Sequence, residues 1–134
     1  MSDYYAMCRS NYFKVKDEQG FHKFIDDYGA EIITKSVNGQ ILFGFITGHE
    51  LGYIPTRYDE EDDDCISILD EISSYLAEGE TAIIMETGND KAKYLNGLAF
   101  AIHSNGECIS KSLASDIFKE AGNKFGGNIT YCEY

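Results

Sequence analysis

Apolar and polar residues recur with the spacing of strands and helices along most of the chain. A strand rich in Tyr, Phe and Val is predicted at Tyr4–Val15. A helix is predicted to follow it, with Asp17 as its N-cap and Gly29 as the glycine that ends it. The helix is predicted from apolar residues at helical spacing: Phe21, Phe24, Ile25 and Tyr28.

Two Asn-Gly dipeptides, Asn38–Gly39 and Asn105–Gly106, each predict a tight β-hairpin turn. Four predicted strands flank these turns: Glu31–Val37, Gln40–Thr47, Tyr94–His103 and Glu107–Ile109. Because such short turns join antiparallel neighbours, the hairpins disfavour a wholly parallel sheet.

The middle of the chain predicts a loop at Gly48–Tyr58, with a short strand at Leu51–Ile54. An acidic run follows, and then an amphipathic helix that ends at Gly79. This helix is predicted from a broad apolar stripe: Ile66, Ile68, Leu69, Ile72, Tyr75 and Leu76. A buried strand is predicted at Thr81–Glu86 and a turn at Gly88–Asp90.

A third helix is predicted to begin at Ser112 or Leu113 and to end at Lys124, and a strand at Asn128–Tyr131 to close the sheet. The inward face of the helix is predicted to comprise Leu113, Ile117, Phe118 and Ala121. The whole order predicts an α+β fold, with about three helices packed on an antiparallel or mixed sheet. Residues 4–37 and 98–132 share a weak internal similarity, which indicates either a duplication or two units built with the same helix-stop signals.

The chain has 134 residues, which favours a single domain spanning residues 1–134. Its cysteines, Cys8, Cys65, Cys108 and Cys132, form neither a CxxC pair nor a dense disulfide pattern. We expect reduced thiols that behave as small buried hydrophobic residues, in a cytoplasmic protein without a signal peptide or membrane span.

All of the net charge of −12 arises between Tyr58 and Asp90, where twelve Asp and Glu residues occur without one Lys or Arg. The remaining eleven acidic and eleven basic residues cancel. Such a field attracts cations or basic protein partners, and it argues against direct binding of nucleic acid or of an anionic membrane.

The densest acidic segment, Asp59–Asp64, has three interpretations. Helix capping by one of Asp62, Asp63 and Asp64, together with the helix dipole, accounts for two or three carboxylates at this position but not for six. A calcium-binding loop matches the acidic residues at alternating positions, but Asp64 stands where the loop needs glycine and Asp70 where it needs glutamate.

The third interpretation is a decoy surface whose carboxylates imitate the phosphates of a nucleic acid and occupy the basic groove of a nucleic-acid-binding protein. The predicted partner-binding residues are Asp59, Glu60, Glu61, Asp62, Asp63, Asp64, Asp70, Glu71 and Glu78. We therefore expect a binding protein that is not an enzyme and needs no cofactor. Its oligomeric state is left open by the sequence.

Two weaker candidates remain. A small enzyme or ligand-binding domain would use Arg9, His103 and Cys108, although no nucleotide-binding or hydrolase motif is present. An aromatic N-terminal strand could stack bases, but core positions fit its residues better at this net charge. Within that strand, Arg9 and Asn11 form a polar pair that could serve a site on a central strand.

The segment Arg9–Asp17, followed by a helix with Phe21 and Phe24, resembles small acidic proteins carried by bacteriophages and integrative elements. Tyr94–Gly97 and Gly126–Thr130 fit the same pattern. The resemblance implies an inhibitor of host defence, of the anti-restriction or anti-CRISPR kind, acting in the bacterial cytosol. An immunity or regulatory protein that binds a basic toxin or enzyme is the alternative with the same electrostatics.

Overall fold

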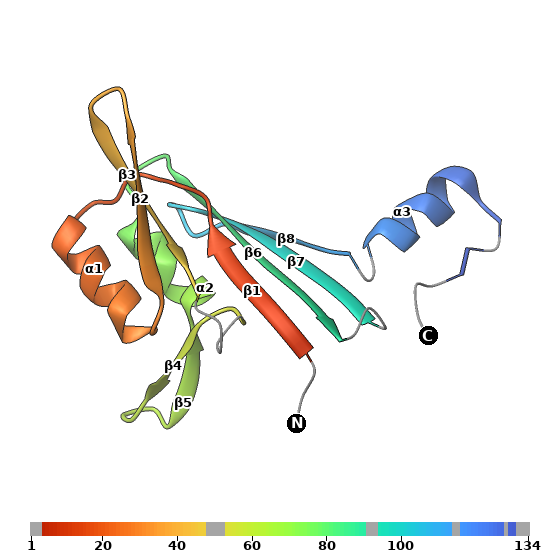
Figure 1. Ribbon diagram of the computed structural model, residues 1–134, viewed down its shortest axis with the longest axis horizontal. Coiled ribbons are helices and arrows are strands. Elements are labelled where there is room, and N and C mark those ends of the chain that lie inside the picture. The colour runs from red at the N-terminus through yellow and green to blue at the C-terminus, as the bar shows by residue number, and fades with distance from the viewer. Residues whose placement is uncertain (1–3, 48–52, 91–93, 114–115, 128, 131–134) are drawn as a thin grey trace.

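The computed structural model describes residues 4–47, 53–90, 94–113, 116–127 and 129–130. Its main sheet has six strands in the order β2-β3-β1-β6-β7-β8, and every pair of neighbours is antiparallel (Figure 1). The strands of this sheet are β1 (Tyr4–Ser10), β2 (Glu31–Val37), β3 (Gln40–Ile46), β6 (Thr81–Asp90), β7 (Tyr94–His103) and β8 (Cys108–Ser112). A separate two-stranded sheet pairs β4 (Thr56–Asp59) with β5 (Asp64–Ser67). The α+β fold in one domain agrees with the prediction.

The described residues contain four helical segments: α1 (Glu18–Asp27), α2 (Ile68–Glu71), the 3-10 helix η1 (Ile72–Tyr75) and α3 (Asp116–Phe125), which follows the last strand. The bounds predicted for α1 are confirmed. Asp17 has the extended backbone of an N-cap, and Gly29 adopts a left-handed φ of 72°. The amides of Gly29 and Ala30 donate to the carbonyls of Asp26 and Ile25, which closes the helix end as a Schellman motif.

The hydrophobic core lies between one face of the main sheet and the layer formed by α1, α2 and η1. Both layers contribute fully buried side chains: Phe13, Phe21, Ile25, Phe45, Ile68, Ile72, Leu76, Ile84 and Ile102. The predicted stripe residues Ile68, Ile72 and Leu76 are each 0% exposed. Ile68 and Ile72 belong to α2 and η1, so the helical stripe was correct for them, whereas Leu76 is buried from an extended backbone that follows η1.

The opposite side of the sheet, called here the open face, follows from the strand register and the alternation of side chains. It carries Met7, Arg9, Ile33, Lys35, Ile46, Ile83, Met85, Ile109 and Lys111. Met7, Met85 and Ile109 are 62%, 51% and 69% exposed, so α1 and α2 leave this face to solvent.

Strand β1 leaves its regular ladder after Ser10. Ser10 and Phe13 are both buried, so two residues, Asn11 and Tyr12, stand between two inward positions instead of one. The Asn11 amide still donates to the Ile83 carbonyl at 3.0 Å, and the Asn11 side chain adds two bonds, since it donates to the Thr81 carbonyl and accepts from the Ile83 amide at 3.2 and 2.8 Å. This irregular segment is therefore fixed to β6.

The helix predicted between the acidic run and Gly79 is wrong in its first turn and at its end, because η1 ends at Tyr75 and Leu76 has an extended backbone that pairs with Val15. Residues 64–67 form β5, because they pair with residues 56–59 of β4. The helix begins only at Ile68, and the Ser67 hydroxyl accepts from the Leu69 amide as its N-cap. The capping role predicted for Asp62–Asp64 is therefore wrong, and the short strand predicted at Leu51–Ile54 lies partly outside the described residues.

The turn predicted at Gly88–Asp90 is also wrong, because these residues continue β6 between β1 and β7. Helix α3 forms near its predicted position, but it contains no buried residue, and Leu113 and Ile117 are 58% and 56% exposed. Figure 1 shows α3 beyond the end of the sheet, away from the other helices. Ile129 and Thr130 are not in a strand, and the rest of the predicted strand Asn128–Tyr131 lies outside the described residues.

Within the described part of the chain, no helix has the length and apolar character needed to cross a membrane.

Candidate functional site

The six acidic residues Asp59–Asp64 form the end of the β4–β5 hairpin, which projects from the body below α1 and α2 in Figure 1. Glu60–Asp63 make the turn, where Asp63 adopts a left-handed φ of 50°. Asp59 stands directly opposite Asp64 in the register. Two carboxylates placed in this way repel each other, so the hairpin keeps an unfavourable charge arrangement at its own end.

Three of these carboxylates hold the turn together. Asp59 accepts from the Glu61 amide at 3.1 Å, and Asp64 accepts from the Cys65 amide at 2.8 Å. The Tyr58 hydroxyl donates to Asp63, and this hydrogen bond raises the pKa of Tyr58. The other three side chains, those of Glu60, Glu61 and Asp62, are exposed and form no hydrogen bond within the described structure. No described basic residue forms an ion pair with any of the six acids.

The base of the hairpin is held by a cluster of Arg57, Glu71 and Tyr28. The Arg57 guanidinium donates two hydrogen bonds to the Glu71 carboxylate at 2.9 and 3.0 Å, and the Tyr28 hydroxyl donates a third at 2.5 Å. The bond from Arg57, with that from Tyr28, lowers the pKa of Glu71. Burial and the bond to Glu71 raise the pKa of Tyr28. The cluster fixes β4 to α1 and α2.

The predicted partner-binding residues thus occupy different environments. Asp59–Asp64 lie together on the hairpin, and Asp70 is exposed on α2. Glu71 is engaged within the protein by Arg57. Glu78 lies in the loop that leads into β6, beside Lys16 and the β7–β8 turn. In the described residues, no group of three His, Cys, Asp or Glu side chains has an arrangement suited to a metal ion.

The residues of the enzyme alternative do not meet. His103 Nδ1 lies 2.9 Å from the Thr81 hydroxyl, in a wide hollow that neither Arg9 nor Cys108 lines. By the strand register, the Cα atoms of Arg9 and His103 are roughly 16 Å apart, at two strand spacings and four residues. Cys108 is exposed and pairs with the inward residue Ile102 on the other side of the sheet.

The cysteines differ from the expectation of uniform burial. Cys8 is buried, and desolvation together with the nearby Glu86 charge raises its pKa to about 12, so its thiol is unreactive. Cys65 and Cys108 are exposed, because both belong to short strands outside the core. Cys132 lies outside the described residues.

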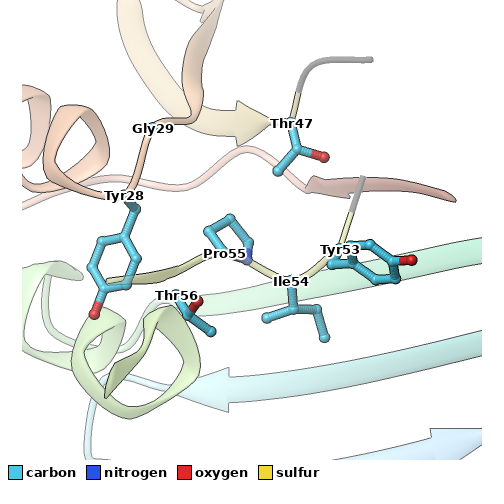
Figure 2. Close-up of a pocket in the computed structure, with 7 residues that line it drawn as sticks. All are labelled: Tyr28, Gly29, Thr47, Tyr53, Ile54, Pro55 and Thr56. Carbon is cyan, nitrogen blue, oxygen red and sulfur yellow. The ribbon is translucent and has the colours of Figure 1, made fainter. Parts of the chain in front are cut away.

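A small pocket lies between the end of α1 and the segment before β4, with a volume of about 150 Å³. Figure 2 shows Tyr28 and Tyr53 at its two ends, Ile54 and Pro55 along one wall and Thr47 on the other. A cavity of this size accepts one benzene-sized group. Its lining contains no carboxylate, imidazole or thiol, so the pocket offers shape but no acid–base pair.

Comparisons with family models, with curated proteins and with solved structures found no match to this chain. The residues themselves therefore carry the functional argument.

Proposed function

We propose that this protein binds a basic, nucleic-acid-handling protein through the β4–β5 hairpin and thereby inhibits it. The observation that carries the proposal is the run of six acidic residues on a projecting hairpin, without a basic partner in the described chain. Neutralising any of these charges by a Lys or Arg groove would relieve the repulsion that the free hairpin retains.

The position of the hairpin supports the same function. Its base is fixed by the Arg57–Glu71–Tyr28 cluster, so the charged turn is presented without first having to be ordered. The Debye length at physiological salt is about 8 Å, so the hairpin acts only on a partner that approaches closely. A carboxylate there takes the place that a phosphate takes in the partner's nucleic-acid complex.

The resemblance to mobile-element proteins narrows the partner to a host-defence protein that binds DNA or RNA, of the restriction or CRISPR kind. The protein would then act in the bacterial cytosol, as a competitor for the groove and without catalysis. The proposal of a host-defence target depends on the resemblance of Arg9–Asp17, Tyr94–Gly97 and Gly126–Thr130 to mobile-element proteins. The proposal of a basic partner depends only on the hairpin.

The test uses matched Glu→Gln pairs that change the net charge equally. E60Q/E61Q removes two charges from the turn, and E18Q/E107Q removes two exposed charges elsewhere. Each tagged protein is used to recover partners from a bacterial lysate at low and at high salt, and the recovered proteins are identified by mass. We expect wild type and E18Q/E107Q to recover the same basic protein at low salt, and E60Q/E61Q to recover much less of it.

The recovered protein is then purified, and its binding to its own nucleic acid is measured with increasing amounts of each variant. Competition by wild type but not by E60Q/E61Q supports the proposal. Equal recovery by all three proteins, or recovery that salt does not weaken, would exclude the hairpin as the binding surface.

A further inference from the structure

A second site of opposite charge lies on the open face. Arg9 and Lys35 approach the same aromatic ring: the Arg9 Cζ atom lies 5.7 Å and the Lys35 Nζ atom 5.9 Å from the centroid of Tyr12. Cation–π contacts at these distances are weak at a protein surface. They nevertheless hold two flexible cations beside one half-buried ring.

Neither cation has a carboxylate partner among the described residues. Most described basic residues share this feature, since only Arg57 and Lys111 among them form ion pairs. The Arg9 Nε–H donates a hydrogen bond to the Ser10 carbonyl at 3.2 Å. The other donors of Arg9 face solvent, as does the Lys35 ammonium, since both side chains are exposed.

A hollow of about 180 Å³ adjoins Arg9, lined by Arg9, Ser10, Asn11, Ile83 and Met85. The amide of Asn11 is already engaged with β6, so the walls that a ligand would meet are mainly those of Ile83 and Met85. The hollow can accept one flat ring, because a cavity of about 150 Å³ holds benzene. A methionine sulfur packs favourably against such a ring.

The segment that carries Arg9 and Tyr12 is rigid. The Asn11 bonds attach it to β6, and Phe13 exchanges two backbone hydrogen bonds with Phe43 of β3, each 2.8 Å long. Irregular stretches of this kind within a sheet often re-aim side chains toward a site. The strand order β2-β3-β1 then places Lys35 of β2 within reach of the Tyr12 ring.

We propose that Arg9, Tyr12 and Lys35 form a binding site for a nucleoside phosphate. The two cations bind the phosphate, and the hollow beside Ile83 and Met85 takes the base. Arg and Lys pair with phosphate oxygens through charge-assisted hydrogen bonds, and the apolar wall of Ile83 and Met85 can pack against the flat face of a base of any identity. The site lies on the open face, away from the hairpin residues, and does not depend on the proposed function.

The net charge limits what this site can bind. A protein of charge −12 repels a long polyanion, whereas one phosphate close to two cations experiences mainly those cations, because more distant charges are screened. A single nucleotide, or the end of one strand, therefore fits these charges better than a duplex.

The test is an NMR titration of the whole chain with adenosine 5′-monophosphate, observed at the backbone amides. Shifts at residues 9–12, 35 and 83–85 are expected in the millimolar range. R9Q/K35Q should weaken binding about tenfold, as expected for the loss of charge-assisted contacts. The control K23Q/K119Q, which removes two exposed lysines from α1 and α3, should bind as wild type does.

A comparison of thymidine monophosphate with an oligothymidylate distinguishes a free nucleotide from a nucleic-acid strand as the natural ligand. Tighter binding of the strand identifies single-stranded nucleic acid as the source, and equal or weaker binding identifies a free nucleotide. The proposal is overturned if adenosine monophosphate shifts none of these amides, or if K23Q/K119Q weakens binding as much as R9Q/K35Q. It is also overturned if inorganic phosphate, or the peptide acetyl-Glu-Tyr-Glu-amide, binds the same residues as tightly as the nucleotide.

Discussion

At Gly44 of β3, the adjacent segment of β1 leaves no room for a side chain. A Cβ atom added there would lie 2.4 Å from the Asn11 carbonyl oxygen and 2.8 Å from the Ser10 hydroxyl. The first of these neighbours is backbone, and it belongs to the irregular segment that presents Arg9 and Tyr12. Gly44→Ala therefore tests both the packing of β1 on β3 and the integrity of the open-face site.

The expected loss of stability follows from the contact between the added Cβ atom and the Asn11 carbonyl oxygen. To reach an ordinary van der Waals distance, β1 and β3 must separate by roughly 1 Å, because carbon and oxygen atoms rarely approach much below the usual contact distance. That separation would stretch the two 2.8 Å bonds between Phe13 and Phe43. Overpacking of this kind costs about 1–3 kcal/mol, and the smaller backbone entropy of alanine in the unfolded chain offsets part of it.

Urea unfolding followed by far-UV circular dichroism measures the loss of stability, and a thermal scan should show Tm lowered by roughly 3–12 °C. Gly122→Ala is the matched control, because no atom outside the neighbouring backbone of its own helix lies within 4 Å of its added Cβ and its φ is not left-handed. Gly122 is in the exposed helix α3, where alanine favours the helix and leaves the core unchanged. Equal stability of Gly44→Ala and wild type would refute the close approach of β1 and β3.

Three further substitutions test other parts of the structure. Asp64→Asn should raise the stability of the hairpin by about 0.2–1 kcal/mol in low salt, because it removes a like charge opposite Asp59, and a fall in Tm would contradict this register. Ser10→Ala should cost about 1–3 kcal/mol in urea unfolding, since its hydroxyl accepts from the buried Phe45 amide at 2.9 Å, and an unchanged midpoint would contradict that bond. Because the folded pKa of Glu71 is lowered, its stabilising effect is complete at neutral pH and is lost as pH falls below the usual value of 4.5. Glu71→Gln should therefore be less stable than wild type at neutral pH, with the difference narrowing in acid, and a difference independent of pH would contradict the ion pair.

Much of the fold followed from local patterns. The bounds of α1, the Asn38–Gly39 turn and the strand β7 were predicted because capping residues and Asn-Gly dipeptides act over a few neighbouring residues. Asn38 and Gly39 do adopt left-handed φ values of 51° and 82°. The apolar stripe after the acidic run also included three residues that are fully buried, Ile68, Ile72 and Leu76.

The errors occurred where partners distant in sequence decide the structure. The pattern at Asp64–Ser67 predicts the start of a helix, but pairing with Thr56–Asp59 makes this segment a strand. Gly88–Asp90 reads as a turn, but β1 and β7 pair with it on both sides. The apolar stripe of α3 predicts burial, yet the stripe does not reveal that the helix lies beyond the end of the sheet.

The two candidate sites also differ in how far the sequence alone could predict them. The acidic run is contiguous, so composition alone reveals it, although the sequence does not show that the run ends a hairpin. The pair of Arg9 and Asn11 could be singled out from polarity in an apolar strand. Lys35 could not, because only the strand order β2-β3-β1 brings it beside Tyr12.

The central claim is that the carboxylates of the β4–β5 hairpin bind a basic partner. The most direct measurement is the affinity of the purified partner for wild type and for E60Q/E61Q/D62N across a range of salt concentrations. These three side chains are exposed and make no hydrogen bond in the described structure, so their substitution should leave the hairpin folded. The account predicts that wild-type binding weakens steeply with salt and that the variant binds several-fold more weakly at low salt, with a shallower slope. The same affinity and the same slope for both proteins would contradict it.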